Sequence, residues 1–164
     1  MVKNISVIGL GKLGGSMAAS FASRNFNVIG VDIDQSVVND FNNGKAPIEE
    51  TGLDDMIKSN KERIRATMDT LEAVVNSEIS FVIVPTPSDQ RGAFSLQFAK
   101  HAFKSLGQAL QKKDSYHVIV MTSTVLPGAC RHGLLSILEE ESGKKCGDDF
   151  GFCYNPEFIA LGSV

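Results

Sequence analysis

The chain has 164 residues, of which 43% are hydrophobic and 21% are charged, and its formal net charge at pH 7 is −3. This is enough apolar sequence for one packed domain, and the mild acidity excludes the basic stripe of a nucleic-acid-binding protein and disfavours an anionic membrane surface. No apolar run is long enough to span a bilayer, and the N-terminus leads into a strand-like segment without a signal-type apolar stretch. We therefore expect a cytoplasmic protein whose partners are neither nucleic acid nor membrane.

The stretch from Asn4 to Asp32 contains the strongest pattern in the chain. A short apolar run over 5–8 leads into a G-x-G-x-x-G motif at the point where a strand should give way to a helix. The motif comprises Gly9, Leu10, Gly11, Lys12, Leu13 and Gly14. Its first glycine permits a tight turn, the second lets the backbone approach a pyrophosphate, and the third lets the helix lie close to the sheet. The helix N-terminus that follows would bind the pyrophosphate through its unpaired N–H groups and its dipole.

Asp32 follows the second apolar strand, over 27–31, close to the offset at which a carboxylate accepts the ribose hydroxyls of an adenosine. The extra phosphate of NADP would meet this carboxylate as a like charge, so Asp32 predicts NAD as the cofactor. Two alternatives stay open. In the first, the glycine motif is only a chance turn, but the flanking strand, helix and acid argue against this interpretation. In the second, Asp32 caps the next helix, a position for which Asp34 is the better candidate.

Beyond Asp32 the sequence alternates between helical segments and apolar strands, the pattern of a parallel sheet with helices on both faces. We expect helices over 35–42, 53–60, 70–75 after a cap at Asp69, 95–111 and 127–142, and strands over 64–67, 79–84, 116–121 and around Phe152. Phe98 shares a helical spacing with Leu106 and Leu110 and is assigned to the core. The sequence thus predicts one α/β domain over residues 1–164, a Rossmann-type doubly wound, mostly parallel six-stranded sheet.

The cysteines Cys130, Cys146 and Cys153 form an odd set without C-x-x-C spacing and with no obvious histidine partners. That spacing is typical neither of a disulfide framework nor of a metal site, so we expect reduced thiols and no metal. The three histidines are assigned to surface or packing roles: His101, His117 and His132.

Polar residues follow three of the later strands, at the edge where open parallel sheets bind ligands. Thr86 lies between two prolines after one strand, Ser123 and Thr124 follow the next, and Glu157 follows the last. The threonines either reach the cofactor or make ordinary loop hydrogen bonds. Glu157 is placed to act on a substrate or a water, unless it is a solvated loop acid or a structural partner for backbone N–H groups.

Six segments occur in a characteristic order: VIGLGKLG, VDID, NGKAPIEETGL, VPTP, TSTVLPG and YNPEF. With them the whole chain resembles the amino-terminal NAD-binding domain of the UDP-glucose/GDP-mannose dehydrogenase family. The resemblance implies an enzyme that oxidises the C6 alcohol of a UDP- or GDP-linked sugar to the uronic acid with two NAD, through an aldehyde and a cysteine thioester. It also implies a role in polysaccharide biosynthesis.

The resemblance further implies which parts of such an enzyme lie outside this chain. In the family the catalytic cysteine and lysine lie in a central helix and a carboxy-terminal substrate domain, and the parent protein is a homodimer through that helix. We therefore expect residues 1–164 to bind NAD but to be inactive alone.

Matched position by position, the resemblance assigns roles to two groups of residues. The cofactor-binding group consists of Gly9, Gly11 and Gly14 at the pyrophosphate, Asp32 at the adenosine ribose, and Thr86, Ser123 and Thr124 along the rest of the dinucleotide. The second group consists of Glu157 and Thr124 as catalytic residues, with Glu157, Phe158 and Ile159 at the sugar. Glu157 would do acid–base work around the thioester.

Three residues depart from the family pattern. Val37 removes a basic side chain near the adenosine ribose, Thr51 replaces a proline, and Leu161 replaces a second glutamate that helps to position cofactor or water. Two other functions stay open on the residues alone. One is a single-step NAD-dependent hydroxy-acid or hydroxyacyl dehydrogenase, and the other is a dinucleotide-sensing module without catalysis.

Overall fold

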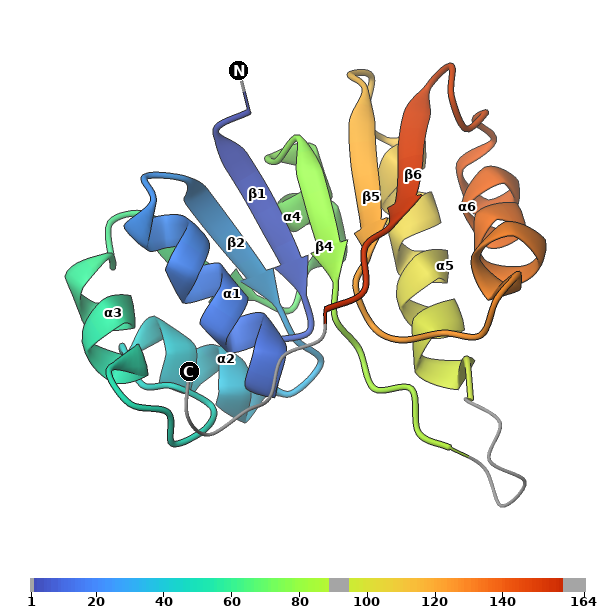
Figure 1. The fold of residues 1–164 in the computed structure, drawn as a ribbon. Helices are drawn as coiled ribbons and strands as arrows, with labels where there is room; N and C mark the ends of the chain where they lie inside the picture. Colours follow the sequence, from blue (N-terminus) through green and yellow to red (C-terminus); the bar gives the residue numbers. More distant parts are fainter. Residues whose placement is uncertain (1, 89–94, 158–164) are drawn as a thin grey trace.

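The computed structural model describes residues 2–88 and 95–157, which form one six-stranded parallel sheet with helices on both faces (Figure 1). The strand order is β3-β2-β1-β4-β5-β6. The strands are β1 (Asn4–Ile8), β2 (Asn27–Val31), β3 (Ile64–Thr67), β4 (Ile79–Val82), β5 (His117–Met121) and β6 (Phe150–Tyr154). The order reverses between β1 and β4, which is the switch point of a Rossmann fold, so the predicted fold class is confirmed.

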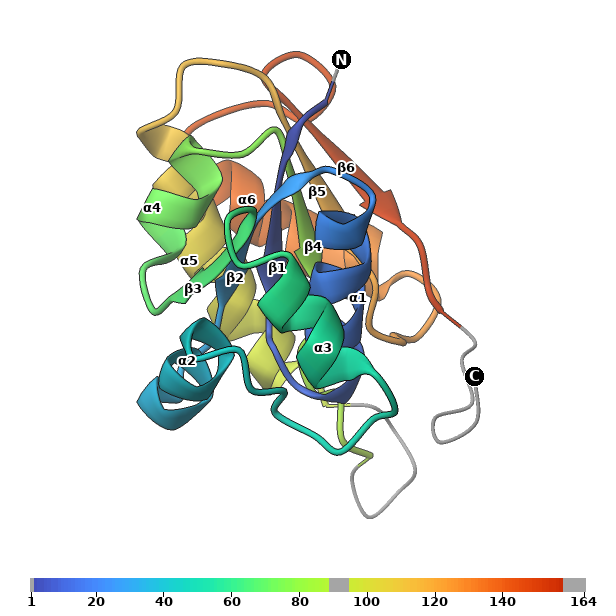
Figure 2. The ribbon, with the colours of Figure 1, turned by 90° about the vertical axis from the view of Figure 1, so that its left-hand side faces the viewer.

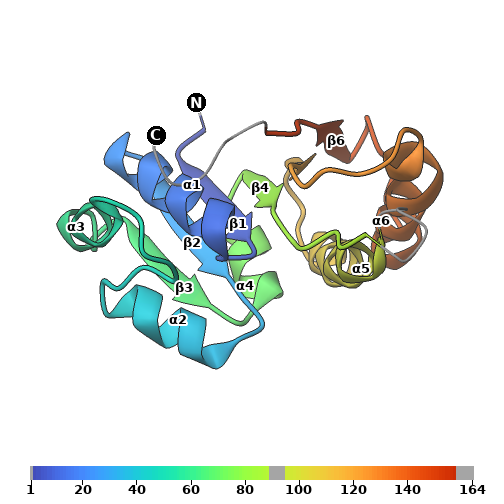
Figure 3. The same ribbon diagram turned by 60° about the horizontal axis from the view of Figure 1, so that its bottom comes forward.

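The helices are divided between the two faces of this sheet. They are α1 (Lys12–Ser23), α2 (Gln35–Asn42), α3 (Leu53–Ser59), α4 (Thr70–Val75), α5 (Gln97–Gln111), the π-helical turn η1 (Cys130–Leu134) and α6 (Leu135–Ser142). Figure 3 shows α1 and α3 on one face and α4, α5 and α6 on the other, with α2 beside the β3 edge. All strands run in one direction, so their carboxyl ends meet at the lower edge of the molecule in Figures 1 and 2.

Each face of the sheet has its own hydrophobic core, because side chains alternate along a strand. In β1, Ile5 and Val7 belong to the core of the α1 face together with Phe41 of α2. Ile8 belongs to the core of the opposite face, which includes Phe103 of α5. Strands buried on both faces read as near-continuous apolar runs, which explains why they were visible in the sequence.

Two aspartates begin helices where the sequence predicted caps. Asp34 Oδ1 accepts a hydrogen bond from the Ser36 N–H at 2.8 Å at the start of α2. Asp69 Oδ1 accepts one from the Leu71 N–H at 2.8 Å at the start of α4. Hydrogen bonds from the Ser36 hydroxyl and N–H also lower the pKa of Asp34, because they stabilise the charged carboxylate. Asp34 therefore caps α2, and Asp32 is available for another role.

Apart from shifts of one or two residues at the ends of elements, two details of the sequence prediction are wrong. The helix expected from Pro127 begins only at Cys130, with the π-helical turn η1 ahead of α6. Phe98, which was assigned to the core, is 43% exposed. The reason is that the core stripe of α5 runs through residues such as Phe103 and Leu110, and Phe98 lies outside it.

A network of buried polar side chains lies near the N-terminal ends of β4 and β5, at the end of the sheet away from the carboxyl ends of the strands. Ser80 Oγ lies 2.6 Å from Ser6 Oγ and 2.8 Å from His117 Nε2. His117 Nδ1 lies 3.1 Å from the Ser77 carbonyl oxygen, to which Lys113 Nζ donates at 2.6 Å. Burial, with the Lys113 charge as a smaller cause, lowers the pKa of His117 to about 4. His117 is therefore a neutral packing residue at pH 7, as predicted.

Candidate cofactor-binding site

The turn from β1 into α1 depends on two glycines that pack against backbone. Gly9 has a φ of 94°, and a Cβ at this residue would lie 2.1 Å from the Ile83 carbonyl oxygen. A Cβ at Gly14 would lie 1.8 Å from the Gly9 carbonyl oxygen. The Gly9 N–H also donates to the Val31 carbonyl oxygen at 2.7 Å, which joins the turn to the end of β2. The first and third glycines of the motif are thus required by the packing of the turn.

Gly11, the second glycine of the motif, has different surroundings. A Cβ there would meet nothing within 4 Å among the described residues, and its φ of −63° suits any residue. Gly11 is exposed and directly precedes α1, whose first N–H groups have no carbonyl partner within the helix. The space in front of Gly11 is therefore open to an anion that approaches these N–H groups, and the residues present fit the pyrophosphate of a dinucleotide.

Asp32 is held against this turn by two backbone groups. Its Oδ2 accepts a hydrogen bond from the Leu10 N–H at 2.8 Å, and its Oδ1 accepts one from the Asp34 N–H at 3.0 Å. These contacts fix the carboxylate at the carboxyl end of β2, next to the glycine turn. Because each carboxylate oxygen can accept a second hydrogen bond, the group can still bind the hydroxyls of a ribose.

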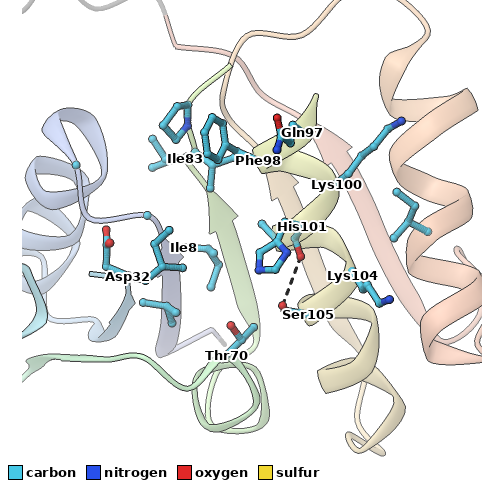
Figure 4. A pocket seen from close by; sticks show the side chains of 18 of the residues that line it. Ile8, Asp32, Thr70, Ile83, Gln97, Phe98, Lys100, His101, Lys104 and Ser105 are labelled. Carbon is cyan, nitrogen blue, oxygen red and sulfur yellow. Dashed lines mark hydrogen bonds between the residues drawn. The ribbon is translucent and has the colours of Figure 1, made fainter. Parts of the chain in front are cut away.

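The turn and Asp32 open onto a groove of about 1090 Å³ between the strand ends and the side of α5 (Figure 4). Gly11 of the glycine turn is among the residues that line it. Asp32, at the end of β2, and His101 of α5 line opposite sides of it (Figure 4). Part of the lining is apolar and accessible, since Ile33 is 79% exposed and Met68 is 48% exposed. A concave site with apolar walls and a few fixed polar groups is typical of small-molecule binding.

The loops after β4 and β5 and the end of β6 are tied to one another beside the groove. The Ser123 hydroxyl accepts a hydrogen bond from the Val84 N–H at 2.9 Å and donates one to the Val84 carbonyl oxygen at 2.7 Å. The Tyr154 hydroxyl accepts from the Val125 N–H at 3.2 Å. These bonds hold the ends of three adjacent strands in one arrangement.

The remaining predicted residues lie on these loops. Thr86 is partly buried and Thr124 is exposed. Glu157 is partly buried, and its Oε1 accepts a hydrogen bond from Asn155 Nδ2 at 3.0 Å. The Asn155 N–H donates to the Met121 carbonyl oxygen at 2.9 Å, which fixes the start of the NPE segment to the end of β5. The predicted sugar-binding residues, and one departure from the family pattern, lie outside the described residues: Phe158, Ile159 and Leu161.

Over residues 3–164 the chain matches the NAD binding domain of the UDP-glucose/GDP-mannose dehydrogenase family. The chain belongs to this family. NAD is accordingly the cofactor of the domain, so both the family and the cofactor predicted from the sequence are confirmed.

Relatives within the family include enzymes named for different nucleotide sugars. The chain is 39% identical over 157 residues to the GDP-mannose 6-dehydrogenase of Pseudomonas syringae pv. tomato, covering 94% of this chain and 36% of that protein. It is 38% identical over 161 residues to a UDP-glucose 6-dehydrogenase of Haloferax volcanii, covering 98% of this chain and 37% of that protein. The chain therefore spans little more than a third of the length of these relatives.

Solved structures of the family have the same fold. A ternary complex of GDP-mannose dehydrogenase from Pseudomonas aeruginosa superimposes with a TM-score of 0.93 at 37% identity, covering 95% of this chain and 36% of that one. A UDP-glucose dehydrogenase from Pyrobaculum islandicum gives a TM-score of 0.92 at 30% identity, covering 99% of this chain and 38% of that one.

In this family member the predicted residues fall into two spatial groups. The groove is lined by Gly9, Gly11, Lys12 and Asp32, while Leu10 is buried beneath the turn, Leu13 is half-buried in α1 and Gly14 packs on Gly9. The loops that follow β4, β5 and β6, referred to below as the tied loops, carry Thr86, Ser123, Thr124 and Glu157. The structure thus brings the glycine turn together with Asp32 and gathers the other polar residues on neighbouring strand ends.

Sequence reasoning missed the wall of the groove that α5 supplies. Phe98, His101 and Ser105 all line the groove and are spaced three and four residues apart, on one face of the helix. That spacing was visible in the sequence. A polar helix face is usually solvated, however, and no signal in the neighbouring sequence indicated that this face of α5 lies opposite the ends of β1 and β2.

Within the described ranges, none of the helices is long and apolar enough to cross a membrane. The histidine, cysteine, aspartate and glutamate side chains of the same ranges do not form a group of three or more that could hold a metal ion.

Proposed function

We propose that the protein is a nucleotide-sugar 6-dehydrogenase, which oxidises the C6 alcohol of a UDP- or GDP-linked sugar to the uronic acid. The overall change consumes one water and two NAD for each alcohol and releases two NADH and three protons. The NAD that binds this domain supplies the hydride acceptor. The relatives of known activity, named as GDP-mannose and UDP-glucose 6-dehydrogenases, support this class of substrate.

The observation that carries the proposal is the position of Asp32. Its carboxylate is fixed by the Leu10 N–H beside an open helix N-terminus at Gly11, so one rigid unit offers an anion site and a hydroxyl-binding site next to each other. In the proposed site Gly9, Gly11 and Gly14 bind the pyrophosphate and Asp32 binds the adenosine ribose.

The tied loops supply the other half of the proposed site. Thr86, Ser123 and Thr124 follow β4 and β5, on the far side of the switch point from Asp32, where the rest of a dinucleotide would extend. Glu157 follows β6, and its contact with the Asn155 amide orients a carboxylate for acid–base work at the substrate. Thr124 is assigned to the same reaction centre.

The nucleophilic cysteine is assigned to the part of the relatives' length that this chain does not span. Burial raises the pKa of the Cys130 and Cys153 thiols, which opposes the thiolate that a covalent nucleophile needs. We infer that residues 1–164 act as a single NAD-binding domain. We also propose that the full-length protein is a cytoplasmic homodimer, joined by a central helix, and that it acts in polysaccharide biosynthesis.

The test is the number of NADH formed per sugar by the full-length protein. Limiting UDP-glucose and limiting GDP-mannose are each supplied with excess NAD, and the absorbance of NADH is followed to completion. About two NADH per sugar, with a uronic acid as product, is the ratio that the four-electron oxidation requires. One NADH per molecule of substrate, with the reaction stopping at the aldehyde, would instead support a single-step dehydrogenase.

A further inference from the structure

Lys113 is a buried cation that has no part in the proposed cofactor site. It lies two residues beyond the end of α5, and only 5% of its surface is exposed. Lysine is almost never buried to this degree unless its charge is paired, yet none of the ion pairs between described residues includes Lys113. Its neighbours Lys112 and Asp114 are exposed, so the backbone lies at the surface and the side chain enters the protein.

Three backbone carbonyl oxygens bind the ammonium group instead of a carboxylate. Lys113 Nζ donates to the Val74 and Val75 carbonyl oxygens at 2.8 Å and 3.1 Å. It also donates to the Ser77 carbonyl oxygen at 2.6 Å. Val74 and Val75 end α4, and the last carbonyls of a helix have no partner within it and carry the negative end of its dipole. Because a neutral amine has only two N–H donors, three acceptors require the charged form.

The charged groups around Lys113 do not replace these carbonyls. Burial lowers the pKa of Lys113, the charge of Glu78 opposes that shift, and the charge of Lys144 adds to it. The Glu78 carboxylate accepts a hydrogen bond from the Asn4 N–H at 2.7 Å, so its direct contact is with the start of β1. The carbonyls are therefore the groups that hold the ammonium in place, and they join the end of α5 to the end of α4.

We propose that the Val74, Val75 and Ser77 carbonyls form a binding site for a primary ammonium ion, which Lys113 fills from within the chain. A primary ammonium group suits the site because it offers three N–H donors on one cationic nitrogen. Truncation of Lys113 at Cβ removes three carbons and the nitrogen, which are the atoms of n-propylammonium. The truncated chain should therefore bind this ion in the space that the side chain has left.

The test is urea unfolding of Lys113→Ala at pH 7, where an alkylammonium is protonated. Without the ion, the midpoint should fall by roughly 1 M urea, because three buried carbonyls lose their donor. Replacing tetramethylammonium chloride, which has no N–H donor, by n-propylammonium chloride at constant chloride should shift the midpoint back toward the native value. This gain should depend on the concentration of the ion, as expected for a ligand that binds only the folded chain.

Two control variants separate a bound ion from a general salt effect. Lys113→Met fills the same space without a charge, so its midpoint should fall and n-propylammonium should not restore it. Lys112→Ala removes an exposed lysine next along the chain and should have the native midpoint in both salts.

A native midpoint in Lys113→Ala or Lys113→Met would overturn the proposal, because the carbonyls would then need no cation. An equal midpoint of Lys113→Ala in the two salts, or an equal gain in Lys113→Met, would overturn it as well. If Lys113→Ala is unfolded without the ion, circular dichroism during addition of n-propylammonium decides: recovery of the native spectrum supports the site, and an unchanged spectrum rejects it.

Discussion

Ser123 makes two hydrogen bonds to the backbone of Val84, one at 2.9 Å from the Val84 N–H and one at 2.7 Å to its carbonyl oxygen. The hydroxyl of the preceding residue, Thr122, is unpaired: its Oγ1 is buried and has no hydrogen-bond partner among the described residues. The two adjacent hydroxyls therefore contribute differently to stability. A paired hydroxyl stabilises the fold, whereas a buried hydroxyl without a partner has lost its hydrogen bonds to water and has not replaced them.

Replacing each hydroxyl in turn tests this difference. Ser123→Ala should lower the free energy of unfolding by about 1–3 kcal/mol, because it leaves both backbone groups of Val84 without their partner. Thr122→Val keeps the shape of the side chain and should change the free energy of unfolding by less than about 0.5 kcal/mol, or raise it. Urea unfolding at pH 7 measures both. Similar losses in the two variants would contradict the distinction.

The glycines of the motif should separate binding from folding. Gly11→Ala places a methyl group in open space, so its melting temperature should stay near that of the native chain while NAD affinity falls at least about tenfold. Gly14→Ala places its methyl group against the Gly9 carbonyl and should destabilise the fold by roughly 2 kcal/mol or more. Thermal unfolding and calorimetry distinguish the two effects, and a folded Gly11→Ala chain with native affinity would exclude this turn as the pyrophosphate site.

The carboxylate of Asp32 should set the preference for NAD over NADP. Asp32→Asn keeps an acceptor for the Leu10 N–H but removes the charge, so NAD affinity should fall about tenfold or more and the discrimination against NADP should shrink. Asp34→Asn is the matched control, because Asp34 caps α2 through Ser36. That variant should change the free energy of unfolding by at most about 1 kcal/mol and leave both affinities as they are. Unchanged discrimination in Asp32→Asn would remove the charge argument.

The buried His117 should make the stability of the domain depend on pH. Its folded-state pKa of about 4 lies below the ordinary value of 6.5, so its stabilising contribution is complete above pH 6.5 and is lost as the pH falls toward 4. The size of the loss is roughly 3 kcal/mol, because one pKa unit corresponds to about 1.4 kcal/mol. Urea unfolding of the native chain and of His117→Gln between pH 7 and pH 4.5 isolates this contribution. The two curves of stability against pH should converge toward low pH, and parallel curves would contradict the assignment.

Glu157 should affect turnover rather than binding of the cofactor. In the full-length protein Glu157→Gln should lower kcat by about a hundredfold or more, the usual effect of losing a general acid or base, with NAD affinity unchanged. Glu62→Gln, at an exposed position before β3, is the control and should have native kinetics. A Glu157→Gln enzyme that forms NADH at the native rate would show that the carboxylate is only a loop acid.

The sheet and its glycine turn were predictable because their signals are local. The apolar runs of β1 and β5, the glycine spacing and the caps at Asp34 and Asp69 each occupy a few consecutive residues, and each signal has one dominant physical explanation. The family resemblance added the expected roles of the strand-end residues, but it could not supply their contacts.

The groove wall could not be predicted in this way. Whether Phe98 is core or rim depends on which side of α5 meets the sheet, and this is decided by packing between segments far apart in the sequence. The same holds for Ser123, whose tie to Val84 joins positions 39 residues apart. Sequence spacing shows which side chains share a helix face, whereas tertiary packing decides what that face meets.

The contact between the Leu10 N–H and the Asp32 carboxylate has a consequence for protein engineering. A redesign toward NADP that replaces Asp32 with a small neutral residue also deprives the Leu10 amide of its acceptor, in the same turn that is expected to hold the pyrophosphate. Exchange of cofactor and integrity of the turn are therefore coupled. A successful redesign must include a substitute acceptor for that amide together with the new basic side chain.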